Sequence, residues 1–376
     1  MKNLMRVLSV LLIATMLLAL VACGNDEEKP SESETLDLGS SSDSESASES
    51  ETESETESET ESESVTIPGD DKLNQPEMTI PTLTAFEISA SSSLKLTTVQ
   101  NAFAPEDCQK VSLSYSKIYE GSLILVNHLH ELKADIEDEL VNISENRAKD
   151  EGKGMYQLSD IYGVLHEEAL TAANKWLTAY YNTMSQDNCM MIAQAYRDYE
   201  TQAAVFENAY ALYGADVLKY SMKPNNSDFR TGYALNLKYY KDNLTYALND
   251  KKIEEQSTKL AELADDYGFV FRYPNADKQY TGLVKDVMPG LYRYVGVPHA
   301  RVMAEGGYCL EEYIAGVKNY TADNRLRIED GANVYQVFYV PAVIDGNTEV
   351  LIPNNATYSV SGNNVDGFIV TLTMAK

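Results

Sequence analysis

Apolar residues recur along the middle of this chain with the spacing of helices and strands. The segment 199–214 predicts a helix that ends at Gly214. The run CMMIAQAYRDY, which starts at Cys189, predicts a buried strand before it. The segment 160–184 predicts an earlier amphipathic helix, with apolar residues at helical spacing: Ile161, Leu165, Ala169, Ala172, Trp176 and Ala179.

Further elements follow on both sides of this region. Residues 122–132, SLILVNHLHEL, predict a strand, and TGYALNL at 231–237 alternates in the same way. Residues 254–274 predict a helix that ends at Gly268 and a strand that Pro274 stops. Residues 291–317 predict a strand followed by helices. Helices and strands in this order predict an α+β domain over residues 106–318.

The pattern changes from residue 319 onward. Short β runs are separated there by the turn sequences DGN and SGNN. The runs are VYQVFYVPAV, TEVLIP, ATYSV and GFIVTLTM. We therefore expect a small β-rich C-terminal extension over residues 319–376.

The first 23 residues predict export. Lys2 and Arg6 precede an apolar run over 7–21, which is typical of a signal peptide. The run ends in Leu-Val-Ala-Cys, which resembles the bacterial lipobox and implies cleavage before Cys23 and a diacylglyceryl thioether on it. This predicts a lipid-anchored protein on the extracellular face of the bacterial cytoplasmic membrane. A transmembrane helix with a chance cysteine is the alternative.

The net charge of −28 is unevenly distributed. Residues 24–64 hold 16 acidic side chains and one Lys in a Ser/Glu/Thr tract that cannot bury a core. We interpret 24–105 as a disordered linker, with at most one short strand between 65 and 105. Such acidity makes nucleic acid an unlikely partner, because a phosphate backbone needs a basic surface. Cys108, Cys189 and Cys309 show no C-x-x-C spacing, and their disulfide state stays open.

Four ordered blocks carry a resemblance to a known family. AYRDYETQAAVFENAY at 195–210 resembles the YRSYETQ..LF segment of VanY-type D-alanyl-D-alanine carboxypeptidases. These are zinc metallopeptidases that trim the terminal D-Ala of peptidoglycan stems. SDFRTGYALNL resembles the family's S-E-H-Q-T-G-x-A-x-D, and LAELADDYGFVFRYP resembles its helix–strand block. MPGLYRYVG resembles E-P-W-H-x-R-Y-V-G. The resemblance covers about 120–318 and implies an antiparallel sheet with flanking helices.

The positions that carry the family's chemistry have changed. A catalytic zinc needs three protein ligands and a nearby base. Phe229 stands for the first His and Asn236 for the Asp, while Met288 stands for the Glu and Leu291 for the second His. The sequence therefore predicts no bound zinc, although the family implies one, and no catalytic residues. If the resemblance is correct, these four positions converge in space around Arg197.

Other polar residues are candidates for a retained binding site or for replacement ligands. The resemblance implies that Arg197 holds a substrate carboxylate and that Gln202 and Ser227 line the same cleft. An Arg buried against carbonyls or carboxylates of its own domain is the alternative. Asp228 lies one residue from a lost ligand, but no His occurs between His166 and His299. The pair His128 and His130 could bind metal on one face of a strand, although outside the family's site.

These observations favour a pseudopeptidase that binds cell-wall stem peptides or a wall-associated partner. Two alternatives stay open: an active D-alanyl-D-alanine carboxypeptidase with an atypical ligand set, and a structural or interaction module that uses the β-rich extension. The sequence leaves the ligand, the role of the extension and the oligomeric state undetermined.

Overall fold

The computed structural model describes residues 67–134, 136–184, 189–274, 280–284 and 286–374. The signal peptide with Cys23, and the acidic tract up to residue 66, lie outside the described residues. None of the helices within the described ranges is long and apolar enough to cross a bilayer.

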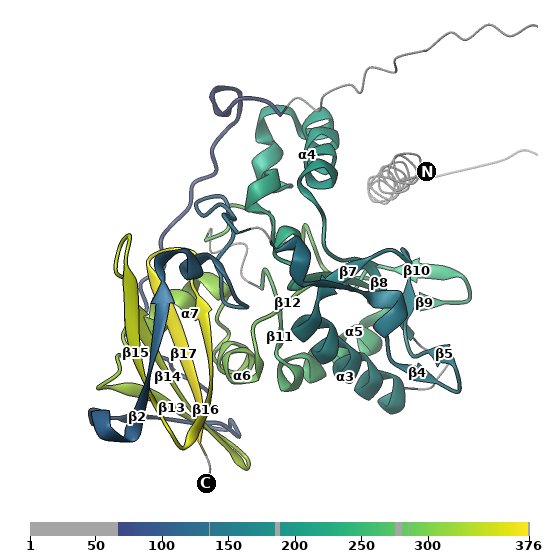
Figure 1. Ribbon diagram of the computed structural model, residues 1–376. Helices are drawn as coiled ribbons and strands as arrows, with labels where there is room; N and C mark the ends of the chain where they lie inside the picture. Colours follow the sequence, from purple (N-terminus) through teal and green to yellow (C-terminus); the bar gives the residue numbers. More distant parts are fainter. Residues whose placement is uncertain (1–66, 135, 185–188, 275–279, 285, 375–376) are drawn as a thin grey trace, which may run out of the picture. The chain divides into compact units, whose positions relative to one another are not determined.

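A central six-stranded sheet organises the middle of the chain (Figure 1). Its strand order is β11-β12-β9-β8-β6, with β10 pairing to β9. All pairs are antiparallel except β6 with β8. The strands are β6 (Gln157–Leu158), β8 (Cys189–Gln194), β9 (Ala234–Lys241), β10 (Leu244–Tyr246), β11 (Phe269–Phe271) and β12 (Leu291–Tyr294). The predicted α+β class is therefore confirmed.

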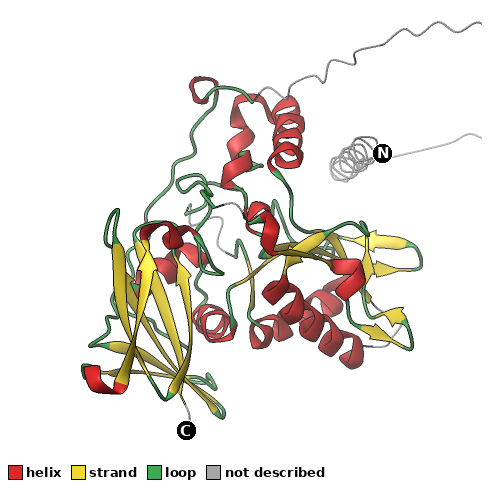
Figure 2. Ribbon diagram, viewed as in Figure 1, coloured by secondary structure: helices red, strands yellow, loops and turns green. Residues whose placement is uncertain are grey.

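Two helices, α3 (Glu167–Thr183) and α5 (Glu254–Ala264), pack against this sheet (Figure 2). Trp176 of α3 is fully buried, and its indole N–H donates to the carbonyl of Leu260 at 3.1 Å. Its ring stacks on Phe269 with centroids 5.0 Å apart. Burial of one large aromatic side chain thus joins both helices to strand β11.

Helix α3 begins later than predicted. Residues 160–163 form a turn, in which the backbone N–H of Tyr162 donates to the Asp160 side chain at 2.9 Å. Val164–His166 then forms β7, which pairs with β3 (Leu140–Asn142). The His166 ring caps the helix by accepting from the N–H of Glu168. The helical spacing of residues 161 and 165 was therefore coincidental.

The predicted strand over 122–132 is wrong. This segment is irregular, with a single bridge between Asn127 and His130. Its backbone carbonyls accept hydrogen bonds from side chains elsewhere in the chain. The Arg293 guanidinium donates to the carbonyl of Ser122 at 3.0 Å and to that of Ile124 at 3.3 Å. Backbone groups that are satisfied by arginine donors need no neighbouring strand, although the segment is as apolar as one.

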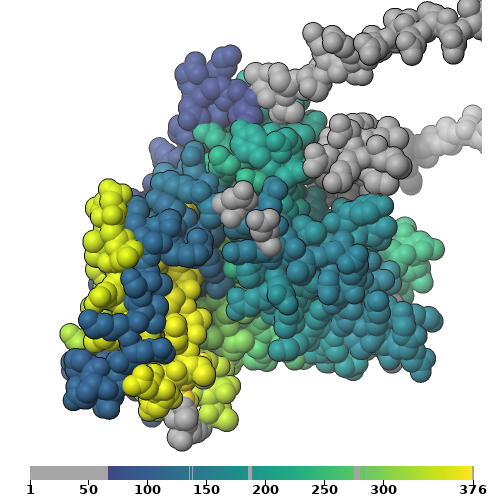
Figure 3. All heavy atoms as spheres, in the orientation of Figure 1, coloured from purple at the N-terminus to yellow at the C-terminus, as the bar shows by residue number. Residues whose placement is uncertain are grey.

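The C-terminal strands form as predicted, but they recruit two strands from the N-terminal side. The five-stranded order is β1-β13-β14-β17-β16, and β15 pairs with β2. Figure 3 shows the blue β2 residues beside the yellow C-terminal ones. The strands are β1 (Lys95–Val99), β2 (Cys108–Ser114), β13 (Arg325–Asp330), β14 (Asn333–Pro341), β15 (Asn347–Pro353), β16 (Ala356–Gly362) and β17 (Gly367–Met374).

Order therefore begins before residue 106. Strand β1 and the buried side chains of Phe86 and Leu94 lie inside the predicted linker 24–105. The N-terminal strands were hard to recognise because their pairing partners, such as β13, lie more than 200 residues away.

Helices α6 (Val297–Gly306) and α7 (Leu310–Val317) join the β-rich extension to the rest of the fold. Their apolar residues share one buried cluster with residues of β13, β14 and β17. His299 adds a polar link, because its ring hydrogen-bonds the Tyr313 hydroxyl at 2.6 Å and the Thr371 hydroxyl at 3.0 Å. The remaining α-helices and strands of the described residues are α2 (Ile143–Asn146), α4 (Tyr199–Tyr213), β4 (Lys149–Asp150) and β5 (Lys153–Gly154).

Candidate functional site

The four altered positions lie together in the structure. Phe229 lies in a short 3-10 helix, Asp228–Thr231, whose end at Gly232 has a φ of 71°. Leu291 of β12 is the cross-strand partner of Asn236 in β9. Phe229 and Leu291 belong to one buried cluster, and Met288 packs against it. Residues from two separate sequence blocks are thus brought to one place by the pairing of β9 with β12.

This place is filled by apolar side chains. Phe229 is 3% exposed and Leu291 1% exposed. The cluster consists of Met222, Phe229, Ala234, Tyr273, Leu283 and Leu291, with Val287 and Met288 packed against it. The Tyr273 hydroxyl is a polar group of this cluster, and it donates to the Asp228 carboxylate at 3.0 Å.

The residues at these positions do not fit zinc. Zinc in proteins is bound by Cys sulfur, His nitrogen or carboxylate oxygen. Phenylalanine and leucine offer no lone pair, and the amide oxygen of Asn236 is neutral. In the part of the chain that the structure describes, no three His, Cys, Asp or Glu side chains lie together where a metal ion could bind.

Arg197 borders this apolar cluster. Its guanidinium carbon lies 4.1 Å from the centre of the Phe229 ring, and its backbone N–H donates to the Phe229 carbonyl at 3.2 Å. One terminal nitrogen donates to the side-chain oxygen of Gln202 at 2.7 Å, and the other donates to that of Gln194. The side chain is therefore held between the end of β8 and the first turn of α4.

The charge on Arg197 has no counter-ion among the described residues. Both side-chain acceptors are neutral amides, and the Nε–H is buried without any acceptor. Burial lowers the pKa of Arg197 to about 9, with no carboxylate to oppose it. The guanidinium still carries its charge at neutral pH. An unpaired buried cation is costly for a fold to maintain, and a bound anion would offset that cost.

The two other predicted site residues differ in their relation to Arg197. Gln202 contacts it directly and is fixed in turn, since its side-chain N–H donates to the Met222 carbonyl at 2.9 Å. Ser227 is buried at the start of the 3-10 helix that carries Phe229. The sequence reasoning missed Gln194, although its position at the end of an apolar strand, three residues before Arg197, was a signal for it.

Asp228 is committed to a buried ionic cluster instead of a metal. One carboxylate oxygen accepts from Arg293 at 2.8 Å, and the other accepts from Arg272 at 2.8 Å and from the Tyr273 hydroxyl at 3.0 Å. Arg272 also binds both carboxylate oxygens of Glu311, at 3.0 and 2.8 Å. The cluster is electrically balanced, with two arginines and two carboxylates.

The pKa of Glu311 in this cluster depends on burial away from water and on the neighbouring donors. Burial alone would raise the pKa of Glu311, but Arg272 and Asn127 together hold that pKa below its usual value. The cluster links strands β11 and β12 with α7 and with the irregular segment that contains Asn127. Lone arginines in otherwise apolar strands were the sequence signal for it.

The four histidines lie apart from Arg197 and Phe229. His128 and His130 lie in the turn at 127–130, so the expectation that they share a strand face is wrong. His128 bonds the Leu218 carbonyl at 2.8 Å, and His130 bonds the Asn127 side chain at 2.9 Å. His166 caps α3, and His299 lies in the first turn of α6.

Comparison with known proteins places the residues around Arg197 in a region that matches a known family. Residues 164–297, which hold Arg197, Phe229 and Leu291, match the VanY family, described as D-alanyl-D-alanine carboxypeptidase. The chain carries a VanY-family domain. A D-alanyl-D-alanine carboxypeptidase of Enterococcus faecium is 27% identical over 281 residues, which is 73% of this chain and 82% of the relative. The putative carboxypeptidase YodJ of Bacillus subtilis (strain 168) is 30% identical over 125 residues, or 33% and 44% of the two chains.

The fold of the VanY-family domain also has a solved counterpart. The vancomycin-resistance D,D-dipeptidase VanXYg, solved with a D-Ala-D-Ala phosphinate analogue, superposes with a TM-score of 0.60 at 28% identity. The match covers 71% of this chain and 99% of that one. The resemblance inferred from four sequence blocks is therefore confirmed at the level of family and fold.

Proposed function

We propose that this protein is a surface-anchored, non-hydrolytic relative of the D-alanyl-D-alanine carboxypeptidases that binds the carboxyl end of cell-wall stem peptides. The observation that carries the proposal is Arg197, a buried cation with neutral partners beside the altered ligand positions. A guanidinium suits a carboxylate because its planar donors can bind both oxygens.

The loss of hydrolysis follows from the chemistry of the altered positions. Without His, Asp or Glu there, the site can neither activate a water molecule nor polarise a peptide carbonyl through a metal. Phe229 instead supplies an aromatic face against which the guanidinium lies. The domain could therefore bind a peptide carboxylate without hydrolysing the peptide. Arg197 is available for binding, whereas Phe229 and Leu291 cannot be zinc ligands.

The proposed location is the outer face of the cytoplasmic membrane. Cys23 would carry two lipid chains, which is about what stable anchoring needs. The acidic tract after it would act as a spacer between the membrane and the VanY-family domain. Cys23→Ala should release the protein from the membrane fraction, and its retention there would argue for a helical anchor.

Measurements of zinc content and of hydrolysis test the proposal that the protein is non-hydrolytic. We expect the full-length protein, purified in detergent and dialysed, to hold far less than one zinc per chain by elemental analysis. We also expect no D-Ala release from pentapeptide substrate above a blank. Chelator-sensitive D-Ala release would contradict the proposal and would support an active enzyme with an atypical ligand set.

Peptide titration tests the binding part. A stem peptide that ends in D-Ala-D-Ala should bind in the high micromolar to millimolar range, because one charge-assisted pair contributes about 1.5–3 kcal/mol. The same peptide with an amidated carboxyl end should bind at least about tenfold more weakly, because it lacks the anion.

Two variants distinguish recognition from folding. Arg197→Ala should abolish peptide binding, whereas Arg327→Ala should not, because Arg327 pairs with Glu329 on the β-rich extension. Equal binding of free and amidated peptide would contradict the carboxylate role. A denaturant midpoint measured for each variant shows whether Arg197→Ala is still folded, so that lost binding can be assigned to the site.

A further inference from the structure

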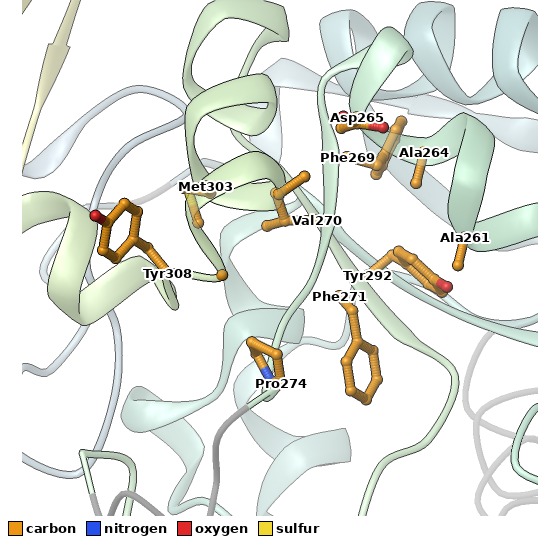
Figure 4. A pocket seen from close by; sticks show the side chains of 12 residues that line it. Ala261, Ala264, Asp265, Phe269, Val270, Phe271, Pro274, Tyr292, Met303 and Tyr308 are labelled. Atoms are coloured by element: carbon orange, nitrogen blue, oxygen red, sulfur yellow. The ribbon is translucent and has the colours of Figure 1, made fainter. Parts of the chain in front are cut away.

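A second surface feature lies at the edge of the central sheet, away from Arg197. A groove of about 180 Å³ follows strand β11 between helices α5 and α6. Figure 4 shows Ala261 and Ala264 of α5 on one side of the strand and Met303 of α6 on the other. Ala261 and Ala304 are both exposed, so each helix presents a small side chain to the groove.

Strand β11 has free backbone groups on this side. Gly268 accepts from the N–H of Val295, and the N–H of Arg272 donates to Leu291. Because antiparallel pairs alternate, Val270 also bonds β12, while the N–H and C=O groups of Phe269 and Phe271 point the other way. Within the described ranges neither residue has a backbone partner there, and Phe271 is partly exposed.

One wall of the groove carries excess negative charge. Asp265 lines the groove and pairs with Arg301 of α6 at 2.7 Å. Asp266, Glu305 and Asp330 also lie within 4 Å of Arg301, so four carboxylates surround one guanidinium. The Asp266 side chain, which directly follows Asp265 in the chain, is 54% exposed. A cationic group near this wall would offset the surplus charge.

The size of the groove limits what it can hold. Pockets for drug-sized ligands are typically about 300–1,000 Å³, so about 180 Å³ suits a single apolar side chain. The free edge of β11 suits an extended backbone, which can add to a sheet edge as a further strand. A second copy of this chain is a poor occupant, because each copy carries a net charge of −28.

We propose that the groove along β11 binds an extended segment of another protein, which pairs with the backbone of Phe271 as an added strand. An apolar side chain of this segment lies between Ala261 and Ala304. A Lys or Arg of the segment lies near Asp265 and Asp266. Such a segment would combine backbone pairing for affinity with one pocket and one charge for selectivity. This site does not depend on Arg197 and can exist whatever the VanY-family site binds.

The probe for the test is the blocked peptide acetyl-Lys-Val-Ile-Val-Lys-amide, carrying a fluorophore on an added linker. It has no free carboxylate, so Arg197 contributes nothing to its binding. With the full-length protein in detergent, we expect saturable anisotropy changes below about 5 mM peptide. Hydrogen exchange at the Phe271 amide should slow when the peptide is present, because that amide gains an acceptor.

Substitutions at two exposed positions test the pocket and the wall charge separately. Ala304→Phe should fill the pocket, and Asp266→Lys should reverse the wall charge, each weakening binding by about tenfold. Glu349→Lys, an equal charge change at an exposed position of strand β15, and Arg197→Ala should leave binding unchanged. If Glu349→Lys weakens peptide binding as much as Asp266→Lys does, the loss of binding depends on net charge alone. That result would overturn the proposal.

Backbone pairing has its own test. Adjacent amides of an added strand point to opposite sides, so N-methylation of one central amide should abolish binding and N-methylation of its neighbour should not. Equal binding of both methylated peptides, unchanged binding to Ala304→Phe, or no binding of the parent peptide at about 5 mM would each overturn the proposal.

Discussion

Asp228→Asn is the most informative single change in the ionic cluster. The aspartate is completely buried and bridges Arg272 and Arg293, each at 2.8 Å. Asparagine preserves the shape of the side chain but removes its charge. Arg272 would keep Glu311 as a partner, whereas Arg293 would lose the carboxylate with which it pairs. The buried cluster would change from neutral to a net charge of +1.

The expected loss of unfolding free energy is about 3–5 kcal/mol, because removal of one partner leaves an uncompensated charge in the interior. Asp216→Asn is the matched control. Asp216 pairs with Lys219 at 2.9 Å, but the two side chains are 48% and 43% exposed. Water screens such a pair, so that the control should lower the unfolding midpoint far less than Asp228→Asn does.

Denaturant unfolding at pH 7 measures both variants against the unchanged chain. The midpoint should fall strongly for Asp228→Asn, while the slope with denaturant should stay the same if the two-state transition is preserved. A loss below about 1 kcal/mol for Asp228→Asn, equal to that of the control, would refute the view that Asp228 is a structural anion. It would also reopen the question of whether Asp228 serves a ligand.

Two other changes test the site and the core. A triple variant should bind about one zinc per chain by elemental analysis, because it restores three ligands: Phe229→His, Asn236→Asp and Leu291→His. A folded triple variant without zinc would contradict the inferred convergence of these positions. Burial lowers the pKa of His299 to about 3, which is below the unfolded value of about 6.5. Its contribution to stability is therefore complete above pH 6.5 and declines toward pH 3, by about 2 kcal/mol between pH 7 and pH 5. Unfolding at both pH values should show a smaller decline for His299→Gln, and an equal decline would contradict this assignment.

Local sequence patterns were sufficient for elements whose partners lie nearby or whose ends carry strong signals. Helix α4 ends at Gly214 as predicted, and strand β11 follows Gly268 as predicted. The four altered site positions could also be identified, because a motif fixes its residues by spacing alone. Their chemistry, the absence of lone pairs at Phe229 and Leu291, is a property of the side chains and needs no coordinates.

Other features required the tertiary structure because they depend on which distant groups satisfy a backbone or a charge. The apolar segment 122–132 reads as a strand, yet donors of Arg293 take its carbonyls and leave it irregular. The neutral partners of Arg197 were likewise invisible, since only folding shows that Gln194 and Gln202 reach it in place of a carboxylate.

The sequence by itself determined the family, the order of the middle elements and the residue types at the four positions that correspond to the family's ligands and base. Tertiary structure alone decided that β1 and β2 complete the C-terminal sheets, and that Asp228 is enclosed by two arginines. The physical reason is the same in both cases. Hydrophobic periodicity is local and is written into consecutive residues, whereas strand partners and buried counter-ions are selected among residues far apart in the chain.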